Sequence, residues 1–509
     1  MKNKRSISLF LSVLSVIFLG FFFGPATANA AGVEVPGSLV QIIVQSNPVD
    51  LSSPWQKKGV ESSAGSGVII DGQRILTAAH VITDYVSVEV KREGMTKRYI
   101  AEVEFICHEC DLATLTVKED KFFEGVKPII LGDTPELQDV VSVFGYPIGG
   151  SAVSVTEGIV SRVEVSSYVH SKRSLLLAQI DAAINAGNSG GPVVADGSLV
   201  GIAIQAIDGA ENVGYMVPAV VIGHFLEDIE DGKLKGFPEL GVTVQAVRNP
   251  AMRKSLGMSE EYTGALVGKV FFDGSLYGFV QPGDVLLEID EQQIAEDLTI
   301  PFGNGKRVEF SNVAQSKQVG EVMSVAVLRN GKRLEGSVEL KSTPYLVPRP
   351  QYSRNPSYYI FGGVVFQPLT MEYVKLFDAW WGNNAPEELK FYANYSNEAF
   401  DDQRQVILIN KVLAAPLNRG YQDMGDLIVE NVNGKKPRDL KDLADMIENE
   451  TSPLIEIRAQ SGESIVLDRE QALRDAGGIL EMHGVHADRS ADLEEPEHTS
   501  LAVIKGGRR

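Results

Sequence analysis

The sequence has few cysteines, fewer basic than acidic residues, and few long apolar runs. Only two cysteines occur among 509 residues, so no disulfide framework holds the fold together. The 47 basic residues are outnumbered by 67 acidic ones, and the net charge of −20 argues against non-specific binding to nucleic acid or anionic lipid. Beyond the N-terminal segment, no run is long and apolar enough to span a bilayer. These shortages exclude a nucleic-acid coat protein, a small disulfide scaffold and a multi-span membrane protein.

What the sequence does contain is ordinary globular material. Hydrophobic residues make up 44% and charged residues 22% of the chain, which is typical of folded domains and not of disordered segments. At roughly 150 residues per domain, the length corresponds to about three domains.

The N-terminus has the order of a secretory signal peptide. Three basic residues lie among the first five, a mostly apolar run covers 7–23, and the small-residue sequence ANA follows at 28–30. This order predicts a signal peptide over 1–30 with cleavage after Ala30, and the alternative is an uncleaved N-terminal anchor. We expect a mature protein without a membrane span, exported to a periplasm or an equivalent extracytoplasmic space.

The rest of the chain divides into units by its pattern of apolar residues. From about 39 to 221, short β-branched runs broken by glycine and turn residues predict an all-β barrel or sandwich, closed by a helix over 218–229. Two further units share a short, weak sequence repeat, GDVLLE at 283–288 and GDLIVE at 425–430, which hints at duplication. The expected divisions are a signal peptide (1–30), a β-rich unit (31–232), a second unit (237–342), a proline-rich linker (343–358), a third unit (359–470) and a charged tail (471–509).

Three short motifs of the β-rich unit carry catalytic residue types. The sequence ILTAAH ends on His80, DLATL begins on Asp111, and GNSGGP surrounds Ser189. A serine becomes a useful nucleophile when a neighbouring base removes its proton, and a buried carboxylate must orient that base. The glycines let the backbone turn sharply, so the N–H groups of Gly187 and Ser189 could form an oxyanion hole.

The order of the three motifs narrows the class of enzyme. The order His, Asp, Ser within one β-rich unit matches the double-barrel serine proteases, whereas α/β-hydrolases place histidine last and subtilisins place aspartate first. We therefore expect a serine endopeptidase that needs no cofactor, because side chains and backbone dipoles supply all the activation.

With these motifs, the chain resembles the HtrA (Deg, or protease Do-like) family of serine proteases. The motifs that carry the resemblance are GSGVII at 65–70, TAAH at 77–80, DLA at 111–113, GYP at 145–147 and GNSGGP at 187–192. The segment from 362–370 through 487–493 is similar to the C-terminal PDZ-like domain of plant-type Deg proteins, and the second unit looks like a PDZ domain. The resemblance implies a mainly β protein, with a chymotrypsin-like double β-barrel followed by two PDZ-like α+β domains.

The resemblance also implies a function. Members of the family degrade misfolded or damaged proteins without ATP, under PDZ control, in oligomers built on trimers. The expected partners are unfolded protein substrates and peptide C-termini, and no nucleic acid. The alternative is a holding chaperone or a PDZ scaffold whose active site is mostly unassembled.

The residues before the nucleophile predict the substrate preference. Trypsin-like enzymes keep an acid six residues before the nucleophile, and here that position is Ala183. We therefore expect cleavage after small or medium aliphatic residues, with Asp181 as the residue that could overturn this expectation. The expected pocket residues are Ala183, Ile184, Gly201, Ile202 and Ala203.

In the second unit, the resemblance places a carboxylate-binding loop at Leu240, Gly241 and Val242. PDZ domains bind a C-terminus by adding it as a strand to a sheet edge. The acidic Glu239 stands just before this loop, where a basic residue is common in the family, and it would repel a carboxylate. The third unit lacks an obvious loop of this kind, which favours a regulatory or assembly role.

The only two cysteines, Cys107 and Cys110, lie immediately before Asp111. One hypothesis is a redox switch, in which a disulfide would strain the segment that carries the catalytic acid. The other is a local disulfide, or two partly buried thiols, without a regulatory role. A metal site with His108 would lack ligands, so no metal is expected.

Overall fold

The structure is a computed structural model that describes residues 35, 37–147, 152–206, 213–303, 305–377, 384–395, 398–400 and 402–494. The predicted signal peptide over 1–30 lies outside the described residues. None of the helices in the described part of the chain is long and apolar enough to cross a membrane.

The first part of the β-rich unit is a closed barrel in the strand order β1-β2-β3-β6-β5-β4. Alternating apolar residues point their side chains into this barrel, with Ile42 and Val44 of β1 buried beside Val88 and Val90 of β4. Two short 3-10 helices, η1 (Ala79–Ile82) and η2 (Asp120–Phe122), interrupt the connections. The strands are β1 (Leu39–Ser46), β2 (Glu61–Ile70), β3 (Arg74–Thr77), β4 (Tyr85–Arg92), β5 (Tyr99–Cys107) and β6 (Leu112–Val117).

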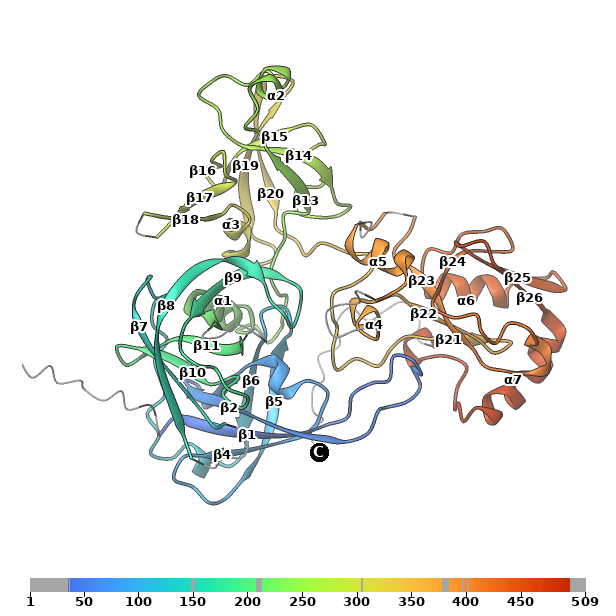
Figure 1. The fold of residues 1–509 in the computed structure, drawn as a ribbon, viewed down its shortest axis with the longest axis horizontal. Helices are drawn as coiled ribbons and strands as arrows, with labels where there is room; N and C mark the ends of the chain where they lie inside the picture. The colour runs from blue at the N-terminus through green and yellow to red at the C-terminus, as the bar shows by residue number, and fades with distance from the viewer. Residues whose placement is uncertain are drawn as a thin grey trace, which may run out of the picture.

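A second closed barrel follows in the order β10-β11-β12-β9-β8-β7. Helix α1 (Ala219–Asp228) comes directly after it, at the place where the sequence pattern predicts a helix. The strands are β7 (Val140–Gly145), β8 (Ser154–Ser167), β9 (Ser174–Ile180), β10 (Pro192–Ala195), β11 (Ser198–Ala206) and β12 (Gly214–Pro218). The prediction of a mainly β protein with a double β-barrel is confirmed (Figure 1).

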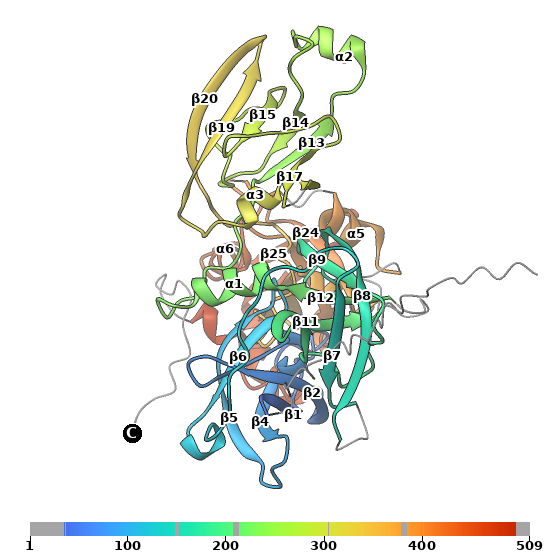
Figure 2. The same cartoon turned by 90° about the vertical axis from the view of Figure 1, so that its left-hand side faces the viewer.

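The second unit stands on the barrels, above β9 and α1 (Figure 2). Its main sheet has the order β13-β14-β15-β19-β20, so β13 is an edge strand, and β17 and β18 form a separate hairpin. The elements are β13 (Val242–Ala246), α2 (Pro250–Ser255), β14 (Ala265–Val270), β15 (Val285–Ile289), β16 (Gln292–Gln293), β17 (Thr299–Phe302), β18 (Lys306–Glu309), α3 (Asn312–Gln315), β19 (Val322–Arg329) and β20 (Lys332–Glu339).

The third unit is a six-stranded sheet in the order β21-β22-β23-β24-β25-β26, with helices packed around it. Its last five strands repeat the strand order of the main sheet in the second unit. The repeated sequences at 283–288 and 425–430 lead into β15 and β24, which are the third strands of these two five-strand orders. The strands are β21 (Tyr359–Phe361), β22 (Val364–Pro368), β23 (Ile407–Val412), β24 (Leu427–Val432), β25 (Leu454–Ala459) and β26 (Ser464–Asp468). The helices are α4 (Met371–Val374), α5 (Glu387–Asn394), η3 (Pro416–Asn418), α6 (Leu440–Glu448), α7 (Arg469–Met482) and η4 (Ala491–Leu493).

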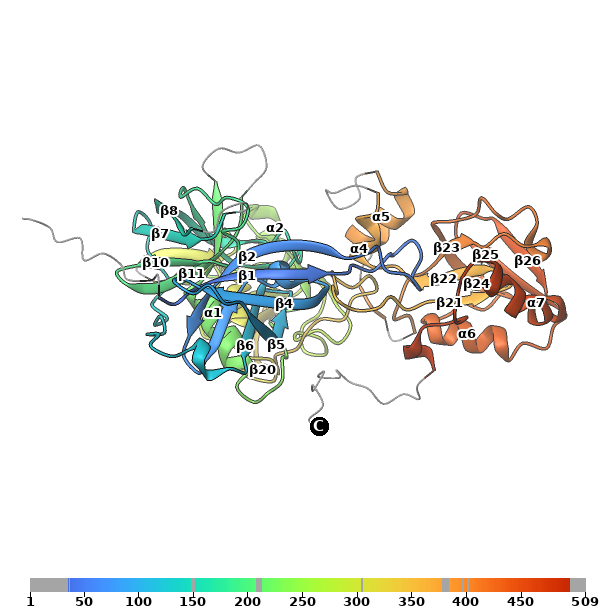
Figure 3. The same ribbon diagram turned by 90° about the horizontal axis from the view of Figure 1, so that it is seen from below.

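Two segments join the third unit to the barrels. The loop between β1 and β2 extends to β21 and β22 (Figure 3), where Trp55 meets Tyr358 edge-on at 5.9 Å. In the same loop, the Leu51 carbonyl accepts a hydrogen bond from the Asn410 side chain at 2.9 Å. The second segment is the proline-rich connection after β20, which runs back over the first barrel before it enters β21.

Candidate active site

His80 is positioned by η1, the short helix that follows β3. The Ala79 N–H donates a hydrogen bond to the Asp111 carbonyl at 3.1 Å, so η1 is tied to the start of β6. The imidazole of His80 is partly exposed, with 29% of its side chain accessible, which leaves one face open to a substrate. The small, buried residues Ala78 and Ala79 directly after β3 permit this tight turn toward the neighbouring strand.

Asp111 holds His80 through two hydrogen bonds. Its Oδ1 accepts the backbone N–H of His80 at 2.8 Å, and its Oδ2 lies 2.7 Å from His80 Nδ1. The residue is buried and adopts a left-handed backbone conformation with φ of 55°, which aspartate tolerates better than most residues. The carboxylate therefore fixes both the position and the tautomer of the imidazole.

The electrostatics of this pair are mutually stabilising. Burial lowers the pKa of His80, but the charge of Asp111 and its hydrogen bond outweigh that effect, so the pKa is raised above its ordinary value of 6.5. Burial likewise raises the pKa of Asp111, but the charge of His80 and the hydrogen bonds from His80 leave it lowered. Asp111 is thus ionised at neutral pH, and a proton on His80 is stabilised.

Ser189 lies in a glycine-rich loop between β9 and β10. Gly187 and Gly190 have φ of 99° and 80°, a region that favours glycine. A Cβ on Gly190 would lie 2.3 Å from both the Ser66 carbonyl and Thr77 Oγ1, so no larger residue fits there. Gly190 is therefore required by the close packing of this loop against the first barrel, and Gly187 is favoured by its backbone conformation.

Ser66 fastens the Ser189 loop to the first barrel. Its N–H donates to the Ser189 carbonyl at 2.9 Å, and its Oγ donates to the Gly187 carbonyl at 2.7 Å while accepting the Tyr146 N–H at 2.8 Å. Ser66 lies within the motif at 65–70, but nothing in that motif signals this role. The contact joins residues 121 positions apart in the chain, so only the folded structure reveals it.

The predicted oxyanion donors are available. Among the described residues, no acceptor takes a hydrogen bond from the N–H of Gly187 or of Ser189. Because buried N–H groups normally have partners, two neighbouring donors without one are suited to bind an oxyanion.

The hydroxyl of Ser189 does not yet contact His80. Its Oγ lies 3.4 Å from the Ile204 carbonyl, and no hydrogen bond joins Ser189 to His80 in the described part of the chain. Such contacts often close only when substrate is bound. The structure brings the three predicted residues to one site, with the link between serine and histidine open.

The predicted pocket residues divide into exposed and buried sets. Ala183 is exposed and Ile184 is half-buried, whereas Gly201, Ile202 and Ala203 are buried. The Asp181 carboxylate is engaged at β8, where its Oδ1 accepts the Ile159 N–H at 2.6 Å.

In the second unit, the predicted peptide loop precedes the edge strand β13. The carbonyls of Leu240 and Gly241 accept hydrogen bonds within the unit, whereas their N–H groups donate none to the described residues. Val242 begins β13 and is half-buried. These are the features that strand addition requires.

Glu239 does not face this loop as a free acid. Its carboxylate forms ion pairs with Arg173 of the β8–β9 turn and with Arg349, the latter at 2.7 Å, and it accepts the Tyr345 hydroxyl at 2.7 Å. Burial raises the pKa of Glu239, but the two arginine charges outweigh burial and leave the pKa lowered. The expected repulsion of a carboxylate ligand is therefore offset by two cations.

Cys107 and Cys110 are free and buried thiols at the turn between β5 and β6. The Cys110 sulfur lies 3.9 Å from the Cys107 carbonyl. Burial raises the pKa of Cys110, which makes its thiolate unfavourable. Among the described residues, no cluster of three or more ligating side chains could hold a metal ion.

Comparison with known proteins identifies the family. The family model for the trypsin-like peptidase domain matches residues 65–202, and that for a PDZ domain matches residues 347–492. Among curated proteins of Arabidopsis thaliana, putative protease Do-like 3, mitochondrial, is 37% identical over 92% of this chain and 82% of its own length. Protease Do-like 4, mitochondrial, is 36% identical over 90% of this chain and 85% of its own length.

A solved structure extends the comparison to the fold. An HtrA-type protease, a variant of AlgW with a decapeptide, aligns with a TM-score of 0.50 at 27% identity and covers 64% of this chain and 99% of its own. Since the similarity to the Do-like proteases spans most of both chains, the protein belongs to the protease Do-like (HtrA/Deg) family of serine proteases.

Proposed function

We propose that this chain is an endopeptidase that hydrolyses unfolded or damaged proteins, with Ser189 as nucleophile, His80 as general base and Asp111 as the residue that orients it. The observation that carries the proposal is the pair of hydrogen bonds that buried Asp111 accepts from His80, beside a loop whose two N–H groups donate to no acceptor among the described residues. This constellation serves acyl transfer.

The reaction follows from this geometry. Because His80 Nδ1 donates to Asp111, its Nε2 carries a lone pair that can take the proton of Ser189. The serine oxygen then attacks the peptide carbonyl, and the N–H groups of Gly187 and Ser189 bind the resulting oxyanion. His80 returns the proton to the leaving amine, and a water molecule repeats the sequence to release the acid and free the serine.

A first step must bring Ser189 to His80. The hydroxyl lies near the Ile204 carbonyl in this structure, so a rotation of its side chain has to precede catalysis. A substrate strand that takes up the Ile204 carbonyl would release the hydroxyl toward His80.

The proposed preference is for small or medium aliphatic residues before the cleaved bond. It rests on Ala183 at the position of the trypsin acid and on Asp181, whose carboxylate is held by β8. A panel of peptide substrates tests it, and preferred cleavage after arginine would contradict it.

For the second unit, we propose that Leu240, Gly241 and Val242 bind peptide C-termini at the edge of β13. Free N–H groups in the loop and an unpaired sheet edge among the described residues support this role. Matched peptides with free and amidated C-termini test it by isothermal titration. Equal affinities would rule out carboxylate recognition.

We infer the compartment from the N-terminal segment. The relatives named above carry mitochondrial labels, and a third, protease Do-like 2 of Arabidopsis thaliana, is named chloroplastic. The apolar run at 7–23 suits a secretory signal better than the amphipathic, arginine-rich pattern of transit peptides. We therefore propose export by a signal peptide over 1–30, tested by N-terminal sequencing of the purified mature protein.

A holding chaperone is the second candidate, favoured by the open contact between Ser189 and His80. Casein digestion by the wild type and by Ser189→Ala separates the two functions. Proteolysis by the wild type alone supports the endopeptidase, whereas suppression of aggregation without cleavage by either protein supports the chaperone. Native mass determination in the same samples tests the proposed trimer-based assembly.

A further inference from the structure

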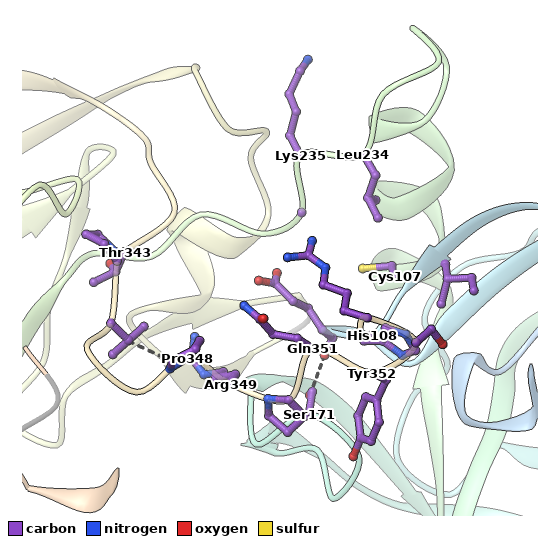
Figure 4. A pocket seen from close by; sticks show the side chains of 18 residues that line it. Cys107, His108, Ser171, Leu234, Lys235, Thr343, Pro348, Arg349, Gln351 and Tyr352 are labelled. Atoms are coloured by element: carbon purple, nitrogen blue, oxygen red, sulfur yellow. Dashed lines mark hydrogen bonds between the residues drawn. The ribbon is translucent and has the colours of Figure 1, made fainter. Parts of the chain in front are cut away.

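The segment 343–354, here called the strap, leaves the second unit and crosses the first barrel close to the candidate active site. It forms one wall of a cavity of about 540 Å³, and the turn at 106–109, just before Asp111, forms another. In Figure 4, the strap residue Tyr352 meets His108 at this crossing, with their ring centroids 5.0 Å apart. The strap thus contacts the segment that leads into Asp111.

Tyr352 packs flat on His170. The two rings are 4.1 Å apart at their centroids with an interplanar angle of 8°, and the Tyr352 hydroxyl donates to the His170 carbonyl at 2.7 Å. The same hydroxyl accepts a hydrogen bond from Lys375, which follows α4 of the third unit, at 2.7 Å. Tyr352 therefore links the third unit to the turn between β8 and β9.

His170 in turn lies between Tyr352 and the catalytic pair. Its ring centroid is 6.1 Å from that of His80, and its Nε2 is 2.9 Å from His108 Nδ1. His108 is three residues before Asp111 on a tight turn. A displacement of His170 would therefore change the surroundings of His80 directly and those of Asp111 through His108.

A second contact reaches His80 from the other end of η1. The Ser353 N–H donates to Asp84 Oδ1 at 2.9 Å, and the Asp84 N–H donates to Ser353 Oγ at 2.8 Å. Asp84 follows η1, the helix that carries His80, by two residues. The strap is thus hydrogen-bonded to the residue four positions after the general base, just beyond the end of η1.

Burial keeps His170 neutral. Burial lowers the pKa of His170 to about 3; the negative charge of Asp111 opposes this effect, and the positive charge of Lys375 adds to it. A neutral ring beside His80 leaves the raised pKa of His80 intact, whereas a cation there would lower it.

His108 is neutral as well. Burial lowers the pKa of His108 to about 4. The negative charge of Asp111 opposes this effect, and the positive charge of Arg354 adds to it. In a hydrogen bond between two neutral imidazoles one ring donates its N–H and the other accepts, so the contact between His108 and His170 couples the tautomers of the two rings.

We propose that Tyr352, acting through His170, is a positioning residue for the His80–Asp111 pair. The inference rests on the proposed function. It assigns to the strap, which connects the second and third units, the role of setting the geometry of the general base. The third unit thereby influences catalysis through Lys375 and Tyr352, without contact with substrate.

The test measures kcat, KM and the pH profile of Tyr352→Ala, Tyr352→Phe and His170→Ala on a short chromogenic peptide. Since misplacement of a catalytic group by about 1 Å can cost up to 100-fold, we expect Tyr352→Ala to lower kcat at least about 10-fold with little change in KM. The acidic limb of its profile should move to lower pH, because His170 becomes solvated and can carry a charge beside His80. Tyr352→Phe, which keeps the ring, should restore most of the rate.

Tyr277→Ala is the matched control, because this tyrosine is 52% exposed in the second unit, and it should match the wild type. If the effect runs through His170, the Tyr352→Ala, His170→Ala double variant will be no slower than His170→Ala alone. A wild-type kcat and pH profile in Tyr352→Ala, or multiplicative losses in the double variant, would overturn the inference. Should Tyr352→Ala fail to fold, Tyr352→Leu, which keeps an apolar side chain but removes the ring stacked on His170, carries the same test.

A failure of the proposed function would look different. In that case, the wild type itself would cleave no peptide and would not react with a fluorophosphonate at Ser189. Wild-type activity combined with unchanged Tyr352 variants would overturn only the role of the strap.

Discussion

The buried ion cluster at Glu239 provides a sharp test of how the units are joined. Its carboxylate contacts the guanidinium groups of Arg173 and Arg349 and the Tyr345 hydroxyl, so it connects a turn of the second barrel, the second unit and the strap. The side chains of Glu239 and Arg173 are only 9% and 5% exposed. Glu239→Gln removes the negative charge and leaves the Arg173 charge buried.

The expected loss follows from the burial of Arg173. Removing one partner of a buried ion pair typically costs about 3–5 kcal/mol, because the remaining charge loses its compensation. For a unit of this size, each kcal/mol lowers the melting temperature by about 2–4 °C, so we expect a decrease of roughly 10 °C. Differential scanning calorimetry at neutral pH measures it.

An exposed ion pair of the second unit provides the control for this change. Glu335→Gln breaks an exposed pair with Arg333, which should cost no more than about 1 kcal/mol. Because the pKa of Glu239 is lowered in the folded protein, its contribution is present above the ordinary value of 4.5 and is lost as the pH falls through the folded-state pKa. The gap between wild type and Glu239→Gln should therefore narrow in acid. Equal melting temperatures for Glu239→Gln and Glu335→Gln at neutral pH would contradict a stabilising role of the buried ion pairs at Glu239.

Three further predictions concern the active site. Asp111→Asn should lower kcat by about 10⁴-fold, which is the usual loss for this change in such a triad. The acidic limb of the kcat/KM profile has its midpoint above pH 6.5 in the wild type and should move to lower pH in the variant. Stopped assays across pH 5–9 measure both effects. Gly190→Ala should abolish peptide cleavage, because its Cβ meets the Ser66 carbonyl and Thr77 Oγ1, and a retained rate would contradict the packing. Ala183→Asp should shift peptide cleavage toward lysine and arginine, and an unchanged preference would place the pocket elsewhere.

Much of the fold was predictable from local patterns. The alternation of apolar residues in β1 and β4 places one face of each strand in the core, and such a pattern is visible in the sequence alone. The helix over 218–229 was expected, and α1 occupies Ala219–Asp228. Helix α7, by contrast, begins at Arg469 and extends into the charged tail, because its apolar positions are too few for the pattern to show a helix.

The catalytic residues were identifiable because each lies in a short motif of its own, whereas their supports were not. Ser66, Glu239 and Tyr352 act through partners 80 to 182 residues away or across unit boundaries. The acidic Glu239 even suggested repulsion of a ligand, since its two arginine partners are remote in sequence. Long-range contacts of this kind leave no periodic signal.

The central claim, that Ser189 is a nucleophile activated by His80, is tested most directly by labelling with a fluorophosphonate followed by peptide mapping. We expect stoichiometric modification of Ser189 in the wild type, parallel loss of casein cleavage, and no labelling in His80→Ala. Casein cleavage that survives with Ser189 unmodified, or labelling of a different serine, would contradict it.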